Sequence, residues 1–557
     1  MDAAEWLLRA LASEGVTHLF GNPGSTELPL LDALPRQHQL RYVLGLHEAA
    51  VMGMADGYAQ ASGRLAAVNV HVQPGIANAL SGVLNAARTR TPVLVTVGQQ
   101  VTGLRDAAPF LGGDVLSPVA GLAKWSAEVD RAADLPAAVR AAVRAALTPP
   151  RGPVVLSLPM DVLVEPAPPA HPTTGGDPPP PPASALLAAA VAALAASDRP
   201  VVLAGDGVAH EDASDAVAAL AERLGAPIWG EPQAARAPIP WDHPLWRGQL
   251  PPFAAQIRPA LEGHDLVLAL GMPVFRVFGD SPGPAMPDGV RLVHVDVDPA
   301  EVGRTTTPDV GVVASVAETV RRLLEGLGPP GERELLRRER TAGAVAVARR
   351  AAIAALPAPQ EDGAVGPADF ARAVAAAVRD DDLVVDESLT SGRALRHLLP
   401  PRRPGTWLAH RGSALGWGLP AAVGAKIADP RSEVLALQGD GSLLFGVHAL
   451  WTAASQGVGV GLVVADNGGY EILRAGMEGL TGRPDGDWPG LALDAPRLDP
   501  AAICAGFGAT AAKVSDAREL PAALADLRNR AAAGPAVLVV PVGGRTPAVG
   551  YPLAPGG

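Results

Sequence analysis

Oxygen-bearing side chains near the C-terminal end of the chain have the types and spacing of a metal site. Asp440 offers a carboxylate oxygen, Asn467 an amide oxygen and Gly469 a backbone carbonyl. Mg²⁺ prefers such hard oxygens and usually takes few of them from the protein, filling its octahedron with water and phosphate oxygens. The three residues therefore predict a site for a metal-bound diphosphate.

Small residues around Asp440 support this prediction. Gly439 and Gly441 let the backbone approach phosphates, and Ser442 opens an expected helix whose N-terminus favours anions. A bare GDG triplet is also consistent with a tight turn after a strand, and a second one stands at 205–207. The Asn-Gly-Gly-Tyr sequence at 467–470 favours the phosphate site.

The surrounding elements explain how these residues meet. Residues 433–470 have the pattern of a strand, a glycine-rich turn, a helix, a second strand and a loop. A strand–helix–strand unit takes about 30 residues or more. Its parallel strands place Asp440 and Asn467 at the same carboxyl edge of a sheet, where ligands bind in open α/β folds.

Two proline-rich segments, at 165–184 and 356–367, divide the chain into similar blocks. The blocks 1–165, 185–345 and 366–557 each alternate apolar strand-like runs with Ala/Leu-rich helical segments. Such runs are typical of parallel sheets covered on both faces, so we expect three consecutive α/β domains. The expected strands are THLFG, RYVLGL, LAAVNVH, PVLVTVG and PVVLSLP, then PVVLAGDG, LVLALG and LVHVDVD, and finally LVVDE, EVLALQGDG, GVGLVVADN and PAVLVVPV.

Bulk properties narrow the class of protein. The chain has 557 residues, a formal charge of −12 and no basic stripe, which argues against nucleic acid as a partner. Cys504 is the only cysteine, so an intramolecular disulfide and a cysteine-based metal site are excluded. The N-terminus lacks the pattern of a signal peptide, and no run is long enough to span a membrane. We expect a soluble cytoplasmic protein.

The GDGS segment also resembles a known signature. Asn467 follows Gly441 after 25 intervening residues, as in thiamine-diphosphate-dependent enzymes. GNPGSTELP at 21–29, HEAAVMGMADGYAQASG at 47–63 and ALWTAA at 449–454 resemble the benzoylformate decarboxylases of the pyruvate decarboxylase and acetolactate synthase superfamily. The resemblance spans essentially the whole chain. It implies pyrimidine-binding, central and diphosphate-binding domains in that order, with thiamine diphosphate and Mg²⁺ as cofactors.

Glu48 opens the expected helix after RYVLGL. An acid in a first helical turn is stabilised by the helix dipole whatever its function. The resemblance implies more, namely that Glu48 shares a proton with N1′ of the aminopyrimidine, since a carboxyl in an apolar pocket holds its proton tightly. By the same resemblance, this proton sharing would shift the 4′-amine of the cofactor to an imine, which would remove the proton from C2 of the thiazolium ring. That ring would then serve as the electron sink when carbon dioxide leaves.

The resemblance implies further cofactor contacts. Leu415 would wedge the cofactor into a bent shape, although it could also be ordinary packing, and the Ser413 carbonyl would hold the 4′-amine. The other cofactor-lining residues that the resemblance implies are Asn78, Thr390, Tyr470 and Ile472.

Substrate-side residues follow from the same comparison. Ser25 would hold the substrate carboxylate, although Ser25 or Thr26 could equally be a helix N-cap. His71 would relay protons, because the imidazole ordinarily titrates near neutrality. The family's second histidine is missing, since VFRVFGD places Phe278 at its position. Without that histidine, His71 or water would protonate the enamine left after decarboxylation. Alternatively, the enamine would live longer and be captured by an aldehyde acceptor.

The remaining pocket residues are apolar. Leu389 and Ile472 join Phe278 in a wall suited to an aromatic or branched acyl group. We therefore expect a decarboxylase of such a 2-oxo acid, with carboligase activity. The alternatives are an acetolactate-synthase-like carboligase, with FAD in the central domain, another thiamine-dependent C–C lyase, or an inactive scaffold homologue.

Glu48 and Asp440 fall in different blocks of the chain. By resemblance, one subunit supplies the pyrimidine half of each site and its partner the diphosphate half. We therefore expect at least a homodimer, and the resemblance to the family implies a homotetramer.

Overall fold

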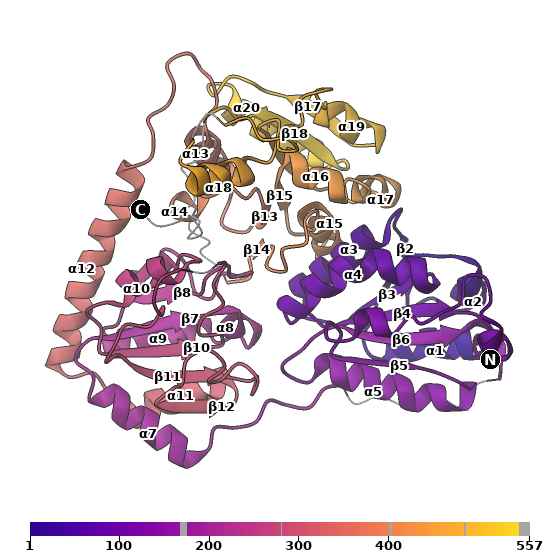
Figure 1. The fold of residues 1–557 in the computed structure, drawn as a ribbon, viewed down its shortest axis with the longest axis horizontal. Helices are drawn as coiled ribbons and strands as arrows, with labels where there is room; N and C mark the ends of the chain where they lie inside the picture. Colours follow the sequence, from indigo (N-terminus) through magenta and orange to yellow (C-terminus); the bar gives the residue numbers. More distant parts are fainter. Residues whose placement is uncertain (167–174, 280, 400–403, 484–485, 545–557) are drawn as a thin grey trace.

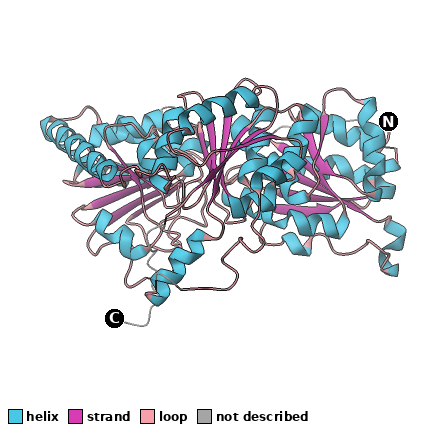
Figure 2. Ribbon diagram, turned by 90° about the horizontal axis from the view of Figure 1, so that it is seen from above, coloured by secondary structure: helices cyan, strands magenta, loops and turns pink. Residues whose placement is uncertain are grey.

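The computed structural model describes residues 1–166, 175–279, 281–399, 404–483 and 486–544. Part of the first expected linker, residues 167–174, lies outside this range. The described chain forms three six-stranded sheets, and their strands pair in parallel (Figure 1). Helices cover both faces of the sheets (Figure 2), as their almost wholly apolar central strands require. The expectation of three consecutive parallel α/β units is confirmed.

The N-terminal sheet carries the first half of the candidate site. Its strands lie in the order β2 (Arg41–Leu44), β1 (His18–Asn22), β3 (Ala66–Val70), β4 (Val93–Gln99), β6 (Val154–Pro159) and β5 (Trp125–Glu128). Its helices are α1 (Ala3–Ser13), α2 (Leu28–Ala33), α3 (Glu48–Ser62), α4 (Val72–Arg88), α5 (Leu135–Leu147) and α6 (Met160–Val164). The direction of the strand order changes between β1 and β3, which makes this pair the topological switch point.

The C-terminal sheet repeats the same order. Its strands are β14 (Trp407–Ala409), β13 (Leu383–Glu387), β15 (Val434–Gly439), β16 (Gly461–Asp466), β18 (Ala536–Pro541) and β17 (Thr510–Lys513). Its helices are α13 (Pro367–Ala377), α14 (Leu395–Leu398), α15 (Gly418–Ala428), α16 (Asp440–Gly446), α17 (Ala449–Gln456), α18 (Glu471–Thr481), α19 (Pro500–Gly506) and α20 (Leu520–Ala531). The switch point here lies between β13 and β15.

The central sheet has a different, doubly wound order. It runs β12 (Val310–Val313), β11 (Arg291–Asp296), β10 (Leu266–Leu270), β7 (Pro200–Ala204), β8 (Ile228–Gly230) and β9 (Trp246–Gln249). Its helices are α7 (Ser184–Ala195), α8 (Asp206–His210), α9 (Ser214–Leu224), α10 (Ala254–Leu261), α11 (Val316–Leu327) and α12 (Glu332–Ala354). The long helix α12 leads from this unit towards the C-terminal one (Figure 1).

The strands that the sequence analysis missed share one property. Five of them, β5, β9, β12, β14 and β17, lie at the edges of the sheets, and β8 lies beside an edge. All five edge strands are short, and all but the three-residue β14 are partly exposed, so their sequences lack the continuous apolar run of a buried parallel strand.

Close helix packing joins the N-terminal and C-terminal units. A Cβ atom on Gly57 of α3 would lie 2.1 Å from the Ala421 carbonyl oxygen, and one on Gly424 of α15 would lie 1.8 Å from that of Met54. Only glycine permits this approach. The Trp417 indole also donates a 2.6 Å hydrogen bond to the buried Asp56 carboxyl. These contacts fix the position of α15 and of the loop that precedes it.

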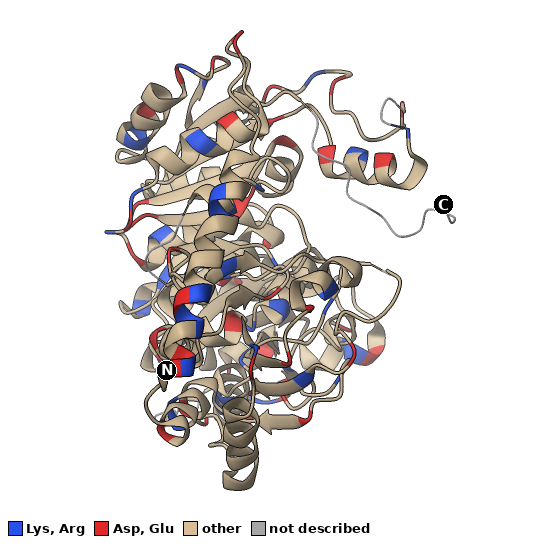
Figure 3. Ribbon diagram, turned by 90° about the vertical axis from the view of Figure 1, so that its left-hand side faces the viewer, with Lys and Arg blue, Asp and Glu red and all other residues tan. Residues whose placement is uncertain are grey.

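Figure 3 shows that acidic and basic residues alternate along the ribbon, without a long stretch of one sign. Within the described residues, no helix combines the length and the apolar character needed to cross a membrane.

Candidate functional site

A cavity of about 510 Å³ lies at the carboxyl ends of the C-terminal strands, around the switch point between β13 and β15. This edge is where open α/β sheets bind ligands. The structure brings together here every expected residue of the diphosphate and acyl halves of the site: Phe278, Leu389, Thr390, Ser413, Leu415, Gly439, Asp440, Gly441, Ser442, Asn467, Gly469, Tyr470 and Ile472.

The candidate metal ligands stand at the ends of neighbouring strands. Asp440 begins α16 directly after β15, and its Oδ2 accepts a 2.8 Å hydrogen bond from the Gly468 amide after β16. The Gly469 amide donates a 3.2 Å hydrogen bond to Asn467 Oδ1, and this bond stabilises the turn at Asn467. Burial and the nearby Asp466 raise the pKa of Asp440 to about 6. A bound cation would reverse this shift, so the carboxyl and amide oxygens suit Mg²⁺.

The glycines of the GDG triplet make room beside the cavity. A Cβ atom on Gly441 would lie 2.8 Å from a ring carbon of Tyr470, so only glycine lets that ring close over the turn. The helix begins at Asp440 with Gly439 as N-cap, two residues before the expected start. Ser442 therefore lies inside the first turn, where its hydroxyl donates to the Gly439 carbonyl at 3.2 Å.

The loop that carries Ser413 and Leu415 is held from two sides. Asn85 of α4 exchanges two hydrogen bonds with the backbone of Ala414. Glu387, at the end of β13, accepts amide hydrogens from Gly416 and Gly418 at 2.7 and 2.6 Å. Burial raises the pKa of Glu387 to about 8. Glu387 and Asn85 were not predicted from sequence, because their partners lie far along the chain.

Two residues of the cavity have unusual backbone conformations. Ser413 has φ of +66° and Leu389 has φ of +46°, although both are non-glycine residues. Such conformations cost energy and cluster at functional sites. Leu389 remains 36% exposed, and Phe278, packed edge-on against Phe253, is 49% exposed. Apolar surface is therefore available at the cavity wall.

Glu48 lies at the second half of the site, in the N-terminal unit. It begins α3 as expected, and its buried carboxylate is held by two amide side chains. Asn22 Nδ2 lies 3.3 Å from Glu48 Oε1, and Asn78 Nδ2 lies 3.0 Å from Oε2. The surroundings are thus more polar than the apolar pocket that we expected, and the two amides fix the direction of the carboxylate.

His71 lies against Gly24 and Thr26, the two neighbours of Ser25, at the switch point between β1 and β3. It caps α4 immediately after β3, and its Nδ1 is 2.9 Å from Glu27 Oε2 and 3.0 Å from Thr26 Oγ1. Glu27 is buried and also accepts the Gly24 amide at 2.7 Å, so it orients the imidazole firmly. Ser25 is exposed and begins a 3-10 turn whose N-cap is Gly24. Neither Ser25 nor Thr26 is the N-cap.

Asn22, Glu27 and the contact of Thr26 with His71 were not predicted from sequence. All three residues lie within the GNPGSTELP segment at 21–29. Their roles depend on contacts with Glu48 and His71, more than 20 residues away, which no local pattern reveals.

The expected residues of the two halves do not line one common cavity within the described chain. The residues that line the cavity of the C-terminal unit all lie at or after Gln233 among the described residues. Glu48, Asn78, Ser25 and His71 are therefore not part of its wall.

The second GDG triplet has a structural role. Gly205 and Gly271 pack closely at the switch point of the central sheet, where a Cβ atom on Gly205 would lie 2.6 Å from the Gly271 carbonyl oxygen. Asp206 is buried and pairs with Arg411, which also binds Glu231 at 2.7 Å. A cavity of about 560 Å³ lies at the carboxyl ends of the central strands, lined by Glu231, Arg276 and Glu301 among others, so the FAD-containing alternative stays open.

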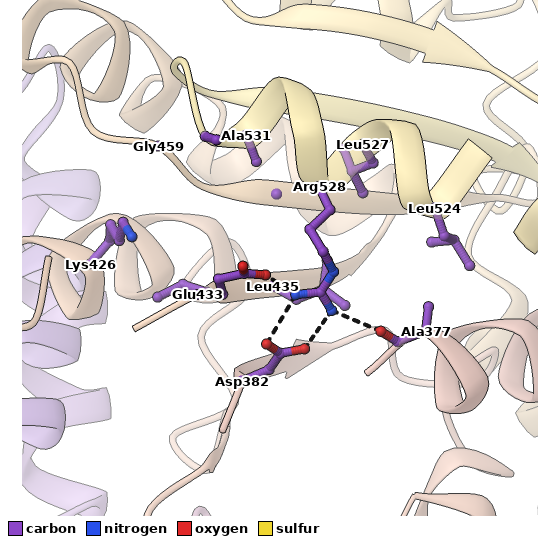
Figure 4. A pocket seen from close by; sticks show the side chains of 13 residues that line it. Ala377, Asp382, Lys426, Glu433, Leu435, Gly459, Leu524, Leu527, Arg528 and Ala531 are labelled. Carbon is purple, nitrogen blue, oxygen red and sulfur yellow. Dashed lines mark hydrogen bonds and ion pairs between the residues drawn. The ribbon is translucent and has the colours of Figure 1, made fainter. Parts of the chain in front are cut away.

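Another cavity, of about 250 Å³, lies at the amino ends of the C-terminal strands (Figure 4). Its central cation, Arg528, pairs with Asp382 and Glu433 and donates to the Ala377 carbonyl at 2.7 Å. These charges satisfy one another, and the cavity lies at the sheet edge opposite the candidate site. We assign it a structural role.

Comparisons with known proteins agree with this arrangement. The chain matches the thiamine pyrophosphate enzyme models for the N-terminal TPP-binding domain at residues 1–117, the central domain at 187–323 and the C-terminal TPP-binding domain at 390–540. It is 38% identical to a benzoylformate decarboxylase of Pseudomonas aeruginosa over 92% of this chain and 94% of that protein.

Two further proteins are similar over most of the chain. A probable acetolactate synthase large subunit of Methanocaldococcus jannaschii is 29% identical over 84% of this chain and 80% of that protein. A thiamine diphosphate-dependent 4-hydroxybenzoylformate decarboxylase of Rhodococcus jostii RHA1 has a solved structure that superposes with a TM-score of 0.86, at 32% identity, covering 97% and 99% of the two chains. The chain belongs to the thiamine pyrophosphate enzyme family, and it carries that family's three domains in order.

Proposed function

We propose that the protein is a thiamine-diphosphate- and Mg²⁺-dependent decarboxylase of an aromatic or branched 2-oxo acid, with acyloin-forming activity. The observation that carries this proposal is the cavity in which Asp440 and Asn467 adjoin the apolar wall of Phe278, Leu389 and Ile472. Similarity to two decarboxylases of arylglyoxylates supports the substrate class. We take blocks 1–165, 185–345 and 366–557 as its domains.

The chain supplies the binding and proton-handling groups. Bound thiamine diphosphate would accept the electron pair of the carbon–carbon bond that breaks when carbon dioxide leaves. Asp440, Asn467 and the Gly469 carbonyl would hold Mg²⁺ on the diphosphate, and the Ser413 carbonyl would accept a hydrogen bond from the 4′-amine. Leu415 would set the bend of the cofactor.

Glu48 would hold the proton at N1′, with its carboxylate oriented by Asn22 and Asn78. Ser25 would bind the substrate carboxylate through its exposed hydroxyl. His71, oriented by Glu27, would move the proton that replaces carbon dioxide. Phe278 cannot transfer protons, so the reacting carbon would remain available longer to an aldehyde acceptor.

The separation of the two halves in one chain leads us to propose an obligatory homodimer, with a homotetramer as its further assembly. Each site would combine Glu48 of one subunit with Asp440 of another. The protein would act in the cytoplasm on a small-molecule substrate.

Carbon dioxide release across a panel of aryl, branched and linear 2-oxo acids tests the function. We expect release to require thiamine diphosphate and Mg²⁺ and to be fastest with aryl or branched acids, because the acyl wall is apolar. Adding an aldehyde should divert part of the product to an acyloin, detected by chromatography. Absence of release from every acid would contradict the decarboxylase proposal.

Mixed oligomers test the shared site. Glu48→Gln and Asp440→Asn should each inactivate the homo-oligomer, whereas co-expressed subunits should recover about a quarter of wild-type activity, since half of random dimers are mixed and each mixed dimer has one intact site. The measurement is carbon dioxide release by the co-expressed, co-purified oligomers. Mixed oligomers without activity would show that both residues act within one chain.

A further inference from the structure

Two arginines of the candidate site have no role in the mechanism above. Arg393 and Arg396 lie in the segment that joins β13 to β14, and both line the cavity that contains Asp440. Arg393 is exposed just before α14, and Arg396 is partly buried within it. The Arg393 amide donates to the Thr390 carbonyl at 3.3 Å, so the backbone here is ordered by its own turn.

Neither guanidinium group is paired. Among the described residues, neither makes a side-chain hydrogen bond or an ion pair, and the nitrogens of Arg396 remain accessible. The third arginine of the cavity differs, since Arg411 is held by Asp206 and Glu231. Burial lowers the pKa of both unpaired groups, and Arg396 lowers that of Arg393 further. The two positive charges therefore lie close together without partners, although buried charges are usually paired.

The acids at the end of β13 offset only one of these charges. Asp386 raises the pKa of Arg396, but its carboxylate accepts the Ser388 amide and hydroxyl at 3.0 and 2.5 Å. Glu387 is largely uncharged at neutral pH, because burial raises its pKa to about 8. Two guanidinium groups thus stand beside one carboxylate, which leaves an excess of one positive charge.

The arginine pair lies away from the metal end of the cavity. Asp440 and Asn467 follow β15 and β16, whereas the arginines follow β13 on the side of β14. Leu389 belongs to the same segment as the arginines, and Leu415 follows β14. The unpaired charges therefore adjoin the apolar wall proposed for the acyl group.

We propose that Arg393 and Arg396 determine substrate specificity by binding a second carboxylate, carried on the ring of an aromatic 2-oxo acid. This inference rests on the proposed function and narrows its substrate class. The apolar wall would hold the ring, and the excess of one positive charge matches one carboxylate. Guanidinium groups bind carboxylates through paired, charge-assisted hydrogen bonds. The carboxylate next to the keto group would leave as carbon dioxide, and the ring carboxylate would remain bound.

The test compares 3- and 4-carboxyphenylglyoxylate with the corresponding carboxamides, which have nearly the same shape and no charge on the ring. In the wild-type holoenzyme we expect kcat/KM for one carboxylate isomer to exceed that for its carboxamide about 10- to 100-fold, the usual contribution of a hydrogen bond to a charged group. The difference should lie in KM, because the arginines would bind the same carboxylate in the ground state and in the transition state.

Substitutions assign the preference to the two arginines. Arg396→Met removes the charge but keeps an extended side chain, so it should abolish the preference, and Arg396→Lys should retain part of it. Arg393→Met, at an exposed position that the fold tolerates, should weaken the preference. Arg431→Met is the control, because Arg431 is 96% exposed and precedes β15 at the opposite edge of the sheet. A wild type that prefers neither carboxylate, or a preference that survives both Arg396→Met and Arg393→Met, would overturn the inference while leaving the decarboxylase proposal intact.

Titration with thiamine diphosphate separates binding of the acyl group from binding of the cofactor. Equal cofactor affinity in the wild type and in Arg396→Met would support the assignment. Weaker cofactor affinity in Arg396→Met, with an unchanged preference for the carboxylate substrate, would assign the arginine to the diphosphate and overturn the inference.

A further binding measurement separates the two proposals if no acid is decarboxylated. Calorimetric titration of the holoenzyme with 3- and 4-carboxybenzaldehyde and with the matching carboxamides reports recognition without turnover. Tighter binding of a carboxylate by the wild type, lost in Arg396→Met and partly retained in Arg396→Lys, would support the assignment. Equal binding of all four aldehydes by the wild type would overturn it.

Discussion

Replacing Glu48 by Gln should lower kcat for carbon dioxide release by about 100- to 10,000-fold, the usual contribution of a general acid or base. The amide keeps the size of the side chain and can still bond Asn22 or Asn78, so the fold should persist. It cannot share a proton with N1′ of the cofactor. Steady-state rates at saturating thiamine diphosphate and Mg²⁺ measure the effect.

A matched control distinguishes chemistry from general damage. Glu325 is exposed on α11 and pairs with Arg321 at the surface, so Glu325→Gln should leave both rate and thermal unfolding unchanged. Unaltered cofactor-dependent turnover in Glu48→Gln would show that Glu48 is not the activating carboxylate.

Asp440→Asn should weaken cofactor binding more than any other single change at the diphosphate end. It removes the only carboxylate proposed to bind Mg²⁺, and a lost metal–ligand contribution of about 3 kcal/mol corresponds to about 100-fold in affinity. The fold should be retained, because the carbonyl oxygen of the introduced side-chain amide can still accept the hydrogen bond from the Gly468 backbone.

Isothermal titration of thiamine diphosphate at several Mg²⁺ concentrations measures this loss. A higher Mg²⁺ concentration should partly restore thiamine diphosphate binding, which would show that the substitution acts by weakening Mg²⁺ binding. Asp516→Asn is the control, because Asp516 pairs with Arg518 at the surface of the same unit. Wild-type affinity in Asp440→Asn at low Mg²⁺ would contradict the assignment.

The site residues that the sequence pattern predicts without the resemblance lie at strand ends. Asp440 directly follows β15 and Asn467 directly follows β16, so parallel pairing alone places them side by side. His71 likewise follows β3. An apolar run with a polar residue at its end carries this information locally.

The residues that escaped prediction act across long sequence separations. Glu387 supports a loop about 30 residues further on, and Asn85 bonds Ala414, 329 residues away. Such contacts depend on how the three units assemble, which residue types and spacing do not specify.

Exchange of the cofactor C2 proton for deuterium tests the central claim most directly, because it requires no knowledge of the substrate. Quenched-flow NMR of the holoenzyme measures the rate on bound thiamine diphosphate. We expect the wild type to accelerate exchange strongly over free cofactor and Glu48→Gln to lose about 100-fold or more of that acceleration. Equal exchange rates in the two proteins, with equal cofactor occupancy, would contradict the assignment of Glu48 as the activating residue.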